Sequence, residues 1–218
     1  MRQAHRLRQC TVIVLCALSA GAVLASASVF AQTIVDEWAT VKVPAAPELK
    51  SVTIDPKATA LLVMDINKQT CNAERRPRCV ASIPKVQRLL TEARAKGVPV
   101  IYSLSGTATT ADIMKELAPR GGEPVLPAVG PDKFLGTDLE KILKDKGIKA
   151  VITVGTAAHG AVLHTASGAA LRGMQAIVPV DGMSADNTYA EQYTAWHLAN
   201  AARVSARVTL TKVDLIQY

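Results

Sequence analysis

The fold follows from one stretch, Val151-Ile-Thr-Val-Gly155-Thr-Ala-Ala-His159-Gly-Ala161-Val-Leu-His-Thr165-Ala-Ser-Gly168-Ala-Ala-Leu-Arg172-Gly173. Its apolar, β-branched start stops at a glycine, and a small-residue segment with helical periodicity follows and ends at 172–173. The pattern predicts a strand, a tight turn and a helix. Ligands of open α/β sheets sit at such a turn, because the helix N-terminus offers unpaired N–H groups and the positive end of a dipole.

Small residues fill this turn and leave its backbone accessible to a bound group. His159 is the only ionisable side chain there. It either donates to a ligand or satisfies a neighbouring carbonyl, and the sequence leaves both interpretations open. We therefore predict that the turn binds substrate through Ala158, His159, Gly160 and Ala161.

Working outward, the apolar run from Ala58 to Met64 predicts a buried parallel strand that ends in Asp65. Further strands are expected at 98–104, 124–126, 174–180 and 207–210. Helices are expected from about Ser82 to Lys96, with Pro84 in the first turn, and at 137–146 and 188–202. This alternation predicts an α/β fold with a doubly wound, mainly parallel sheet. If strand order reverses between the strands at 58–65 and 151–154, Asp65 faces the turn at 158–161 across the switch point.

Two charged side chains are candidates for the chemistry at that point. Asp65, at the carboxyl end of a strand, is predicted to be catalytic, and its alternative role is to organise the following loop. Lys133 lies in a loop expected to approach the switch point, and it is either catalytic or solvated. The polar loop at 66–79 is long enough to border the site, and we predict that its Asn67 binds substrate.

The N-terminus reads as a cleaved signal peptide, residues 1–31, with a basic start, a short apolar segment and a small-x-small site before Gln32. Residues 32–57 are expected to form an extended, proline-rich arm, and 58–218 the domain. The signal holds three arginines and no acidic residue, so the formal charge of +7 falls to +4 after cleavage. The remaining charges are interspersed and aromatics are few, which argues against a nucleic-acid partner. The mature chain is predicted to be periplasmic or secreted and not bound to a membrane.

Only Cys71 and Cys79 stay in the mature chain, and in an exported protein such a pair predicts a disulfide. A metal site is not expected, because no histidine or acidic residue stands at ligand spacing beside the two thiols. A third interpretation makes Cys71 a nucleophile six residues after Asp65, which would require a free thiol.

Four segments resemble, in order and spacing, the isochorismatase-like hydrolase superfamily: Leu61–Asp65, Lys133–Leu139, Gly155–Ala166 and Val178–Met183. The resemblance extends from about Ala58 to the C-terminus. It implies a Rossmann-like, three-layer α/β/α fold, a small-molecule substrate, no cofactor and a homo-oligomer.

Most members of that superfamily are cysteine hydrolases with an Asp, a Lys and a nucleophilic Cys. Asp65 matches the Asp, but the Cys position falls on Ala161 and the Lys position on Ala128. A methyl group cannot form the covalent intermediate of acyl transfer, so ordinary amidase chemistry is disfavoured. The metal-binding acid and histidines of nicotinamidases have no counterpart after Asp65.

The name-giving branch, which hydrolyses the vinyl ether of isochorismate, resembles this chain at Ala158-His159 and needs no cysteine. In that branch the Asp is the general acid, and Lys133 or Lys68 could supply the missing cation. The resemblance implies a cysteine-independent hydrolase with Asp65 as general acid or base. The alternative is a binding protein that keeps the site and has lost the chemistry.

Overall fold

The computed structural model describes residues 33–218, so the predicted signal peptide lies outside the described residues. The chain divides into one unit that ends at Val43 and a second, Pro44–Tyr218. In the first unit, α1 (Ile34–Glu37) and η1 (Trp38–Thr40) contain no buried residue. None of the helices in the described part is long and apolar enough to span a bilayer.

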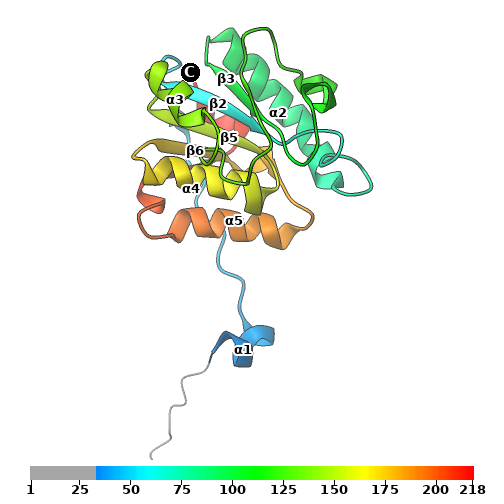
Figure 1. The fold of residues 1–218 in the computed structure, drawn as a ribbon. Coiled ribbons are helices and arrows are strands. Elements are labelled where there is room, and N and C mark those ends of the chain that lie inside the picture. Colours follow the sequence, from blue (N-terminus) through cyan, green and yellow to red (C-terminus); the bar gives the residue numbers. More distant parts are fainter. Residues whose placement is uncertain (1–32) are drawn as a thin grey trace, which may run out of the picture. The chain divides into compact units, whose positions relative to one another are not determined.

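The second unit is built on a seven-stranded sheet in which every pairing is parallel (Figure 1). Its strand order is β4-β3-β2-β5-β6-β8, and β7 pairs with β5 beside this path. The strands are β2 (Thr59–Met64), β3 (Val100–Ser103), β4 (Val125–Leu126), β5 (Ala150–Thr156), β6 (Gln175–Pro179), β7 (Met183–Ser184) and β8 (Val208–Thr211). A separate parallel pair joins β1 (Val52–Thr53) to β9 (Ile216–Gln217).

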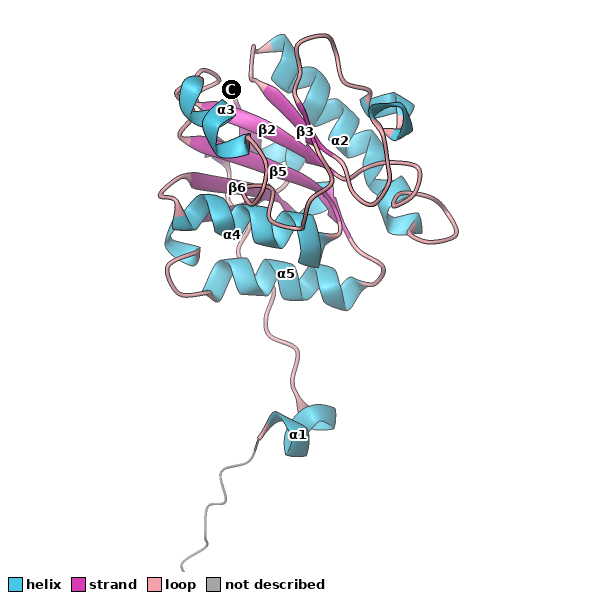
Figure 2. Cartoon of the chain, in the orientation of Figure 1, coloured by secondary structure: helices cyan, strands magenta, loops and turns pink. Residues whose placement is uncertain are grey.

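Helices cover both faces of the sheet, with α2 (Pro77–Ala95) on one face and α4 (Leu163–Leu171) and α5 (Thr188–Asn200) on the other (Figure 2). All six residues of β2 are buried. Because side chains alternate along a strand, they pack into two hydrophobic cores, one on each face of the sheet. Leu61 and Val63 pack in the cluster that contains α2, whereas Leu62 and Met64 pack in the cluster that contains α3 (Leu139–Asp145) and α4. The predicted doubly wound, three-layer fold is confirmed.

The start of α2 differs most from its prediction, while the ends of α3 and α5 differ by one or two residues. The helix expected from Ser82 begins at Pro77, so Pro84 lies inside the helix and not in its first turn. Pro77 takes the first helical position, where proline has no N–H to lose and its fixed φ suits the helix.

The strand order reverses between β2 and β5, which is the condition under which the sequence places Asp65 across from the turn at 158–161. From β2 the chain moves outward through β3 and β4, and from β5 it moves the other way through β6 and β8. Met64 stands opposite Gly155 in the register. Gly155 has φ +139°, and a Cβ on it would lie 2.1 Å from the carbonyl oxygen of Met64, so only glycine allows this approach. The carboxyl ends of β2 and β5 therefore meet where ligands bind in such sheets.

Candidate active site

Asp65 is the first residue after β2 and lies in the left-handed region at φ +58°. Its N–H donates to the carbonyl of Ser103 at 3.1 Å, which turns the chain away from the sheet. The side chain is almost entirely buried, and both oxygens accept hydrogen bonds. Oδ1 accepts from Ser103 Oγ at 2.6 Å and Oδ2 from Lys133 Nζ at 2.9 Å.

Lys133 is only 2% exposed, an unusual burial for lysine. Besides Asp65, its Nζ donates to the carbonyls of Gly130 at 2.9 Å and Leu104 at 3.4 Å. Its backbone N–H donates to Thr165 Oγ1 on α4 at 3.1 Å. Three acceptors therefore surround the ammonium, which offsets the cost of taking its charge out of water.

Burial raises the pKa of the Asp65 carboxyl above its ordinary value, and the positive charge of Lys133 and the hydrogen bond from Ser103 oppose that rise. The net direction is upward. A carboxyl with a raised pKa holds its proton closer to neutral pH, which suits a general acid.

The position of the lysine corrects the carry-over from the family pattern. That pattern places the lysine on Ala128, which is exposed. Lys133, five residues later, places its ammonium on Asp65 instead. Lys68, the other candidate, is exposed and donates to the carbonyl of Ala111. Spacing along a loop does not determine which residue of the loop points inward, so sequence left the two lysines unresolved.

The turn after β5 packs closely. The Thr156–Ala157 peptide is cis, and η4 (Ala158–Val162), a π-helical turn, leads into α4. Ala161 is 3% exposed and belongs to the same apolar cluster as Met64 and Phe134. It precedes Thr165 by about one helical turn, so it lies on the helix face that holds the Lys133 backbone. Ala158 is fully buried and Gly160 partly exposed.

Two predicted substrate-binding residues have other surroundings. His159 is exposed and lines a surface hollow that does not include Asp65 or Lys133. Asn67 is fully buried, and its Oδ1 accepts the N–H groups of Gln69 at 2.9 Å and Thr70 at 3.2 Å. Its Nδ2 donates to Ser105 Oγ at 3.2 Å. The Asn67 amide therefore organises the loop after β2.

Two groups at the switch point were missed by sequence reasoning. Ser103 ends β3, the neighbour of β2, and its place could have been inferred, because parallel strands end at one edge of the sheet. Arg76 is 5% exposed, and its guanidinium donates to Thr156 Oγ1 at 2.9 Å and to Asp186 Oδ1 at 2.7 Å. Nothing in the sequence around Arg76 indicates that partnership.

Cys71 and Cys79 form a disulfide that joins the loop after β2 to the first turn of α2. Neither is a free thiol in this structure, so Cys71 is not available as a nucleophile. Within residues 33–218, the structure contains no group of three His, Cys, Asp or Glu side chains placed to hold a metal ion.

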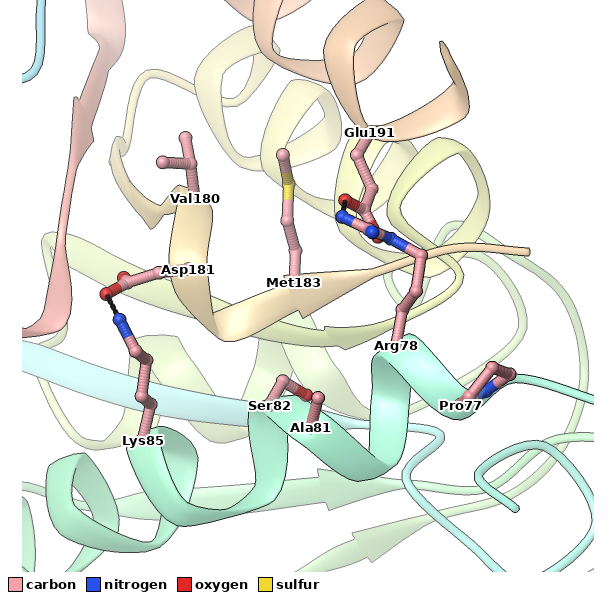
Figure 3. A pocket seen from close by; sticks show the side chains of 9 residues that line it. All are labelled: Pro77, Arg78, Ala81, Ser82, Lys85, Val180, Asp181, Met183 and Glu191. Atoms are coloured by element: carbon pink, nitrogen blue, oxygen red, sulfur yellow. Dashed lines mark hydrogen bonds and ion pairs between the residues drawn. The ribbon is translucent and has the colours of Figure 1, made fainter. Parts of the chain in front are cut away.

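Four hollows of the second unit have neither Lys133 nor Asp65 in their lining. One of about 430 Å³ separates α2 from the segment that contains Asp181 and Met183 (Figure 3). Ion pairs bridge it, Lys85 with Asp181 at 2.8 Å and Arg78 with Glu191 at 2.5 Å. The space beside Lys133, lined by Met64 and Leu139, is too small for a water molecule.

The chain is similar in sequence to a known protein family. The isochorismatase domain model matches residues 59–212, more than half of the chain. The chain belongs to the isochorismatase family.

Two curated relatives match part of the chain. The secreted isochorismatase effector Isc1 of Verticillium dahliae is 34% identical over 113 residues, 47% of this chain and 60% of that protein. The N-carbamoylsarcosine amidase of an Arthrobacter species is 34% identical over 124 residues, 44% of this chain and 47% of that enzyme. The chain thus spans about half the length of these relatives.

Solved structures show the same fold. An isochorismatase family protein from Desulfovibrio vulgaris superposes with a TM-score of 0.66 at 18% identity, covering 72% of this chain and 95% of that one. A cysteine hydrolase from Pseudomonas syringae superposes with a TM-score of 0.64 at 21% sequence identity, covering 77% of this chain and 94% of that one. The nicotinamidase of Staphylococcus aureus superposes with a TM-score of 0.60 at 20% sequence identity, covering 69% of this chain and 96% of that one.

Proposed function

We propose that this protein is an exported hydrolase of a small molecule that works without a cysteine nucleophile and uses Asp65 as general acid and base. The observation that carries the proposal is the buried Lys133–Asp65 pair at the point where strand order reverses. A carboxyl with a raised pKa at this point in the sheet is a candidate for proton transfer.

The absence of a thiol at position 161 restricts the classes of reaction that the site could catalyse. The family pattern places the nucleophile on Ala161, whose methyl group cannot form an acyl intermediate. A vinyl ether needs no such intermediate. Protonated Asp65 gives its proton to the terminal vinyl carbon, and water adds to the resulting oxocarbenium ion. The hemiketal then collapses to an alcohol and a ketone, and the proton lost by the water returns to Asp65. Lys133 and Ser103 hold the carboxylate between these steps.

The alternative is a binding protein that has kept the fold without the chemistry. Two observations favour it: both oxygens of Asp65 are already hydrogen-bonded, and the space beside Lys133 has no room for water. Catalysis would require the loops around the pair to move and admit the substrate.

Export rests on the predicted signal peptide, and the relative from Verticillium dahliae is itself described as secreted. N-terminal sequencing of the protein recovered from outside the cytoplasm should start at Gln32. A protein that keeps Met1 and stays in the cytoplasm would contradict the proposed export.

The experiment for the activity compares wild type, Asp65→Asn and the exposed control Asp138→Asn on vinyl-ether, ester and amide substrates. We expect turnover in wild type and the control, and a loss of about 100-fold or more in Asp65→Asn. Equal turnover in Asp65→Asn would overturn the role of Asp65. No turnover in any of the three, with small molecules still raising the melting temperature, would support the binding protein.

A further inference from the structure

A hollow of about 660 Å³ lies between η4–α4 and α5, and Figure 1 shows α4 and α5 side by side. All three histidines of residues 33–218 line it: His159, His164 and His197. Neither Asp65 nor Lys133 takes part. Its volume is in the range of small-molecule sites, roughly 300–1,000 Å³.

The wall of this hollow is rich in rings. Tyr189 and Tyr193 on α5 join the three imidazoles, and Leu163 and Ala190 add apolar surface. Tyr193 and His197 stack edge to face, with ring centroids 5.7 Å apart. Rings that meet at such angles leave faces and edges on which a further planar ring can pack.

Most polar groups of the hollow can donate a hydrogen bond to a ligand. Its one acid, Asp186, accepts from Arg76 Nε at 2.7 Å and Nη2 at 3.2 Å. These hydrogen bonds and the positive charge of Arg76 lower the pKa of Asp186, so the carboxylate stays ionised and paired. The imidazoles and phenols of the wall remain to meet a ligand.

Two further features favour an anion. The first turn of α5 borders the hollow at Asn187 and Tyr189, and the positive end of the helix dipole attracts negative charge there. The imidazoles and phenols of the wall can each donate a hydrogen bond to a carboxylate oxygen.

We propose that this hollow, the histidine-tyrosine hollow, binds a small aromatic acid. The ring of the ligand packs against Tyr193 and the imidazoles, and its carboxylate meets the donors and the start of α5. The hollow of Figure 3 is a poorer site for a carboxylate, because each of its basic side chains is already paired with an acid. The proposal is independent of the chemistry at Asp65, because it holds for a hydrolase and for a binding protein.

The test is a calorimetric titration of the mature protein with benzoate, with cyclohexanecarboxylate and benzyl alcohol as probes that lack the ring or the charge. We expect saturable binding of benzoate and at least about tenfold weaker binding of the other two. His197→Ala and Tyr193→Ala should each weaken benzoate binding by about tenfold. Trp196→Ala, an exposed aromatic on the same helix outside this hollow, should leave it unchanged.

Circular dichroism and melting curves establish that each variant is folded. Absence of saturable benzoate binding to wild type would overturn the proposal. Binding that survives His197→Ala and Tyr193→Ala together, or that disappears in Asp65→Asn alone, would place the ligand elsewhere and overturn it as well.

Discussion

A buried ammonium and a buried carboxylate meet at the end of β2, and each depends on the other. Lys133 and Asp65 have side chains that are 2% and 8% exposed, so little water reaches either charge. Such a pair adds little net stability when it forms, but removing one partner leaves the other charge unpaired in a low-dielectric site. The pair therefore makes the carboxyl end of β2 sensitive to single substitutions.

Lys133→Met should lower the free energy of unfolding by about 3 kcal/mol, because Asp65 loses its counter-ion. Urea denaturation measures the change, and Lys68→Met, which removes an exposed amine from the neighbouring loop, is the matched control. Adding Asp65→Asn to Lys133→Met should recover part of the loss. If Lys133→Met costs no more than Lys68→Met, the pair does not hold this end of the strand.

Ser103→Ala should raise the pKa of Asp65 further, because the hydroxyl hydrogen bond opposes the effect of burial. Carbon-13 NMR of the Asp65 carboxyl, titrated in wild type and variant, measures the shift directly. An unchanged or lower pKa in the variant would show that the Ser103 hydroxyl does not stabilise the ionised form.

The raised pKa of Asp65 also predicts the direction in which the stability of the protein changes with pH. Between the ordinary value of 3.8 and the higher folded value, Asp65 binds its proton more readily in the folded chain than in the unfolded one. Its contribution is fully present below the ordinary value and is lost as pH rises through the folded pKa. The stability of Asp65→Asn relative to wild type should therefore increase with pH across that window.

At the scale of elements, α2 is anchored at its start by a covalent and a polar link. The Cys71–Cys79 disulfide ties the first turn to the preceding loop, and Arg76, the N-cap residue, reaches Thr156 at the end of β5. The two links hold the loop that follows Asp65 against the switch point.

The double substitution Cys71→Ser, Cys79→Ser should lower the free energy of unfolding by about 2–3 kcal/mol, because the disulfide closes a nine-residue loop in the unfolded chain. Denaturation with and without a reductant checks this. Reductant should bring wild type to the stability of the variant and leave the variant unchanged. A wild type that is insensitive to reductant under unfolding conditions would contradict the prediction.

At the scale of the whole molecule, the second unit contains the sheet and both cores. Residues 33–43 form short helical turns in which no side chain is buried, whereas Lys50 donates to the carbonyl of Leu210 at 2.9 Å and β1 pairs with β9. The edge of the folded domain therefore lies between these two segments.

A chain that starts at Pro44 should match the unfolding free energy of one that starts at Gln32 to within about 0.5 kcal/mol. A chain that starts at Asp55 loses β1 and the buried Ile54, and should be less stable by about 2 kcal/mol or more. Chemical denaturation of the three chains makes the comparison. A large loss of unfolding free energy on removing residues 33–43 alone would contradict this prediction, because it would mean that the segment contributes to the stability of the folded domain.

Sequence alone determined the layers, the parallel sheet and the place of Asp65 at the end of a strand, whereas the reversal between β2 and β5 was only a condition until the structure showed it. These features depend on local signals: apolar runs, glycines at turns and the alternation of short strands with amphipathic helices. The start of α2 was misplaced because Pro77 and Pro84 both suit a first helical turn, and only packing distinguishes them.

Tertiary structure decided which side chains meet Asp65. Lys133 is 68 residues away along the chain and Ser103 is 38. Arg76 and Asp186, which clamp the neighbouring end of β5, are 110 residues apart. Such partners depend on the path of irregular loops and on which strand ends lie next to each other. Local propensity does not determine either, because these side chains meet only when packing of the whole sheet brings distant segments together, and a charge buried there then requires a partner.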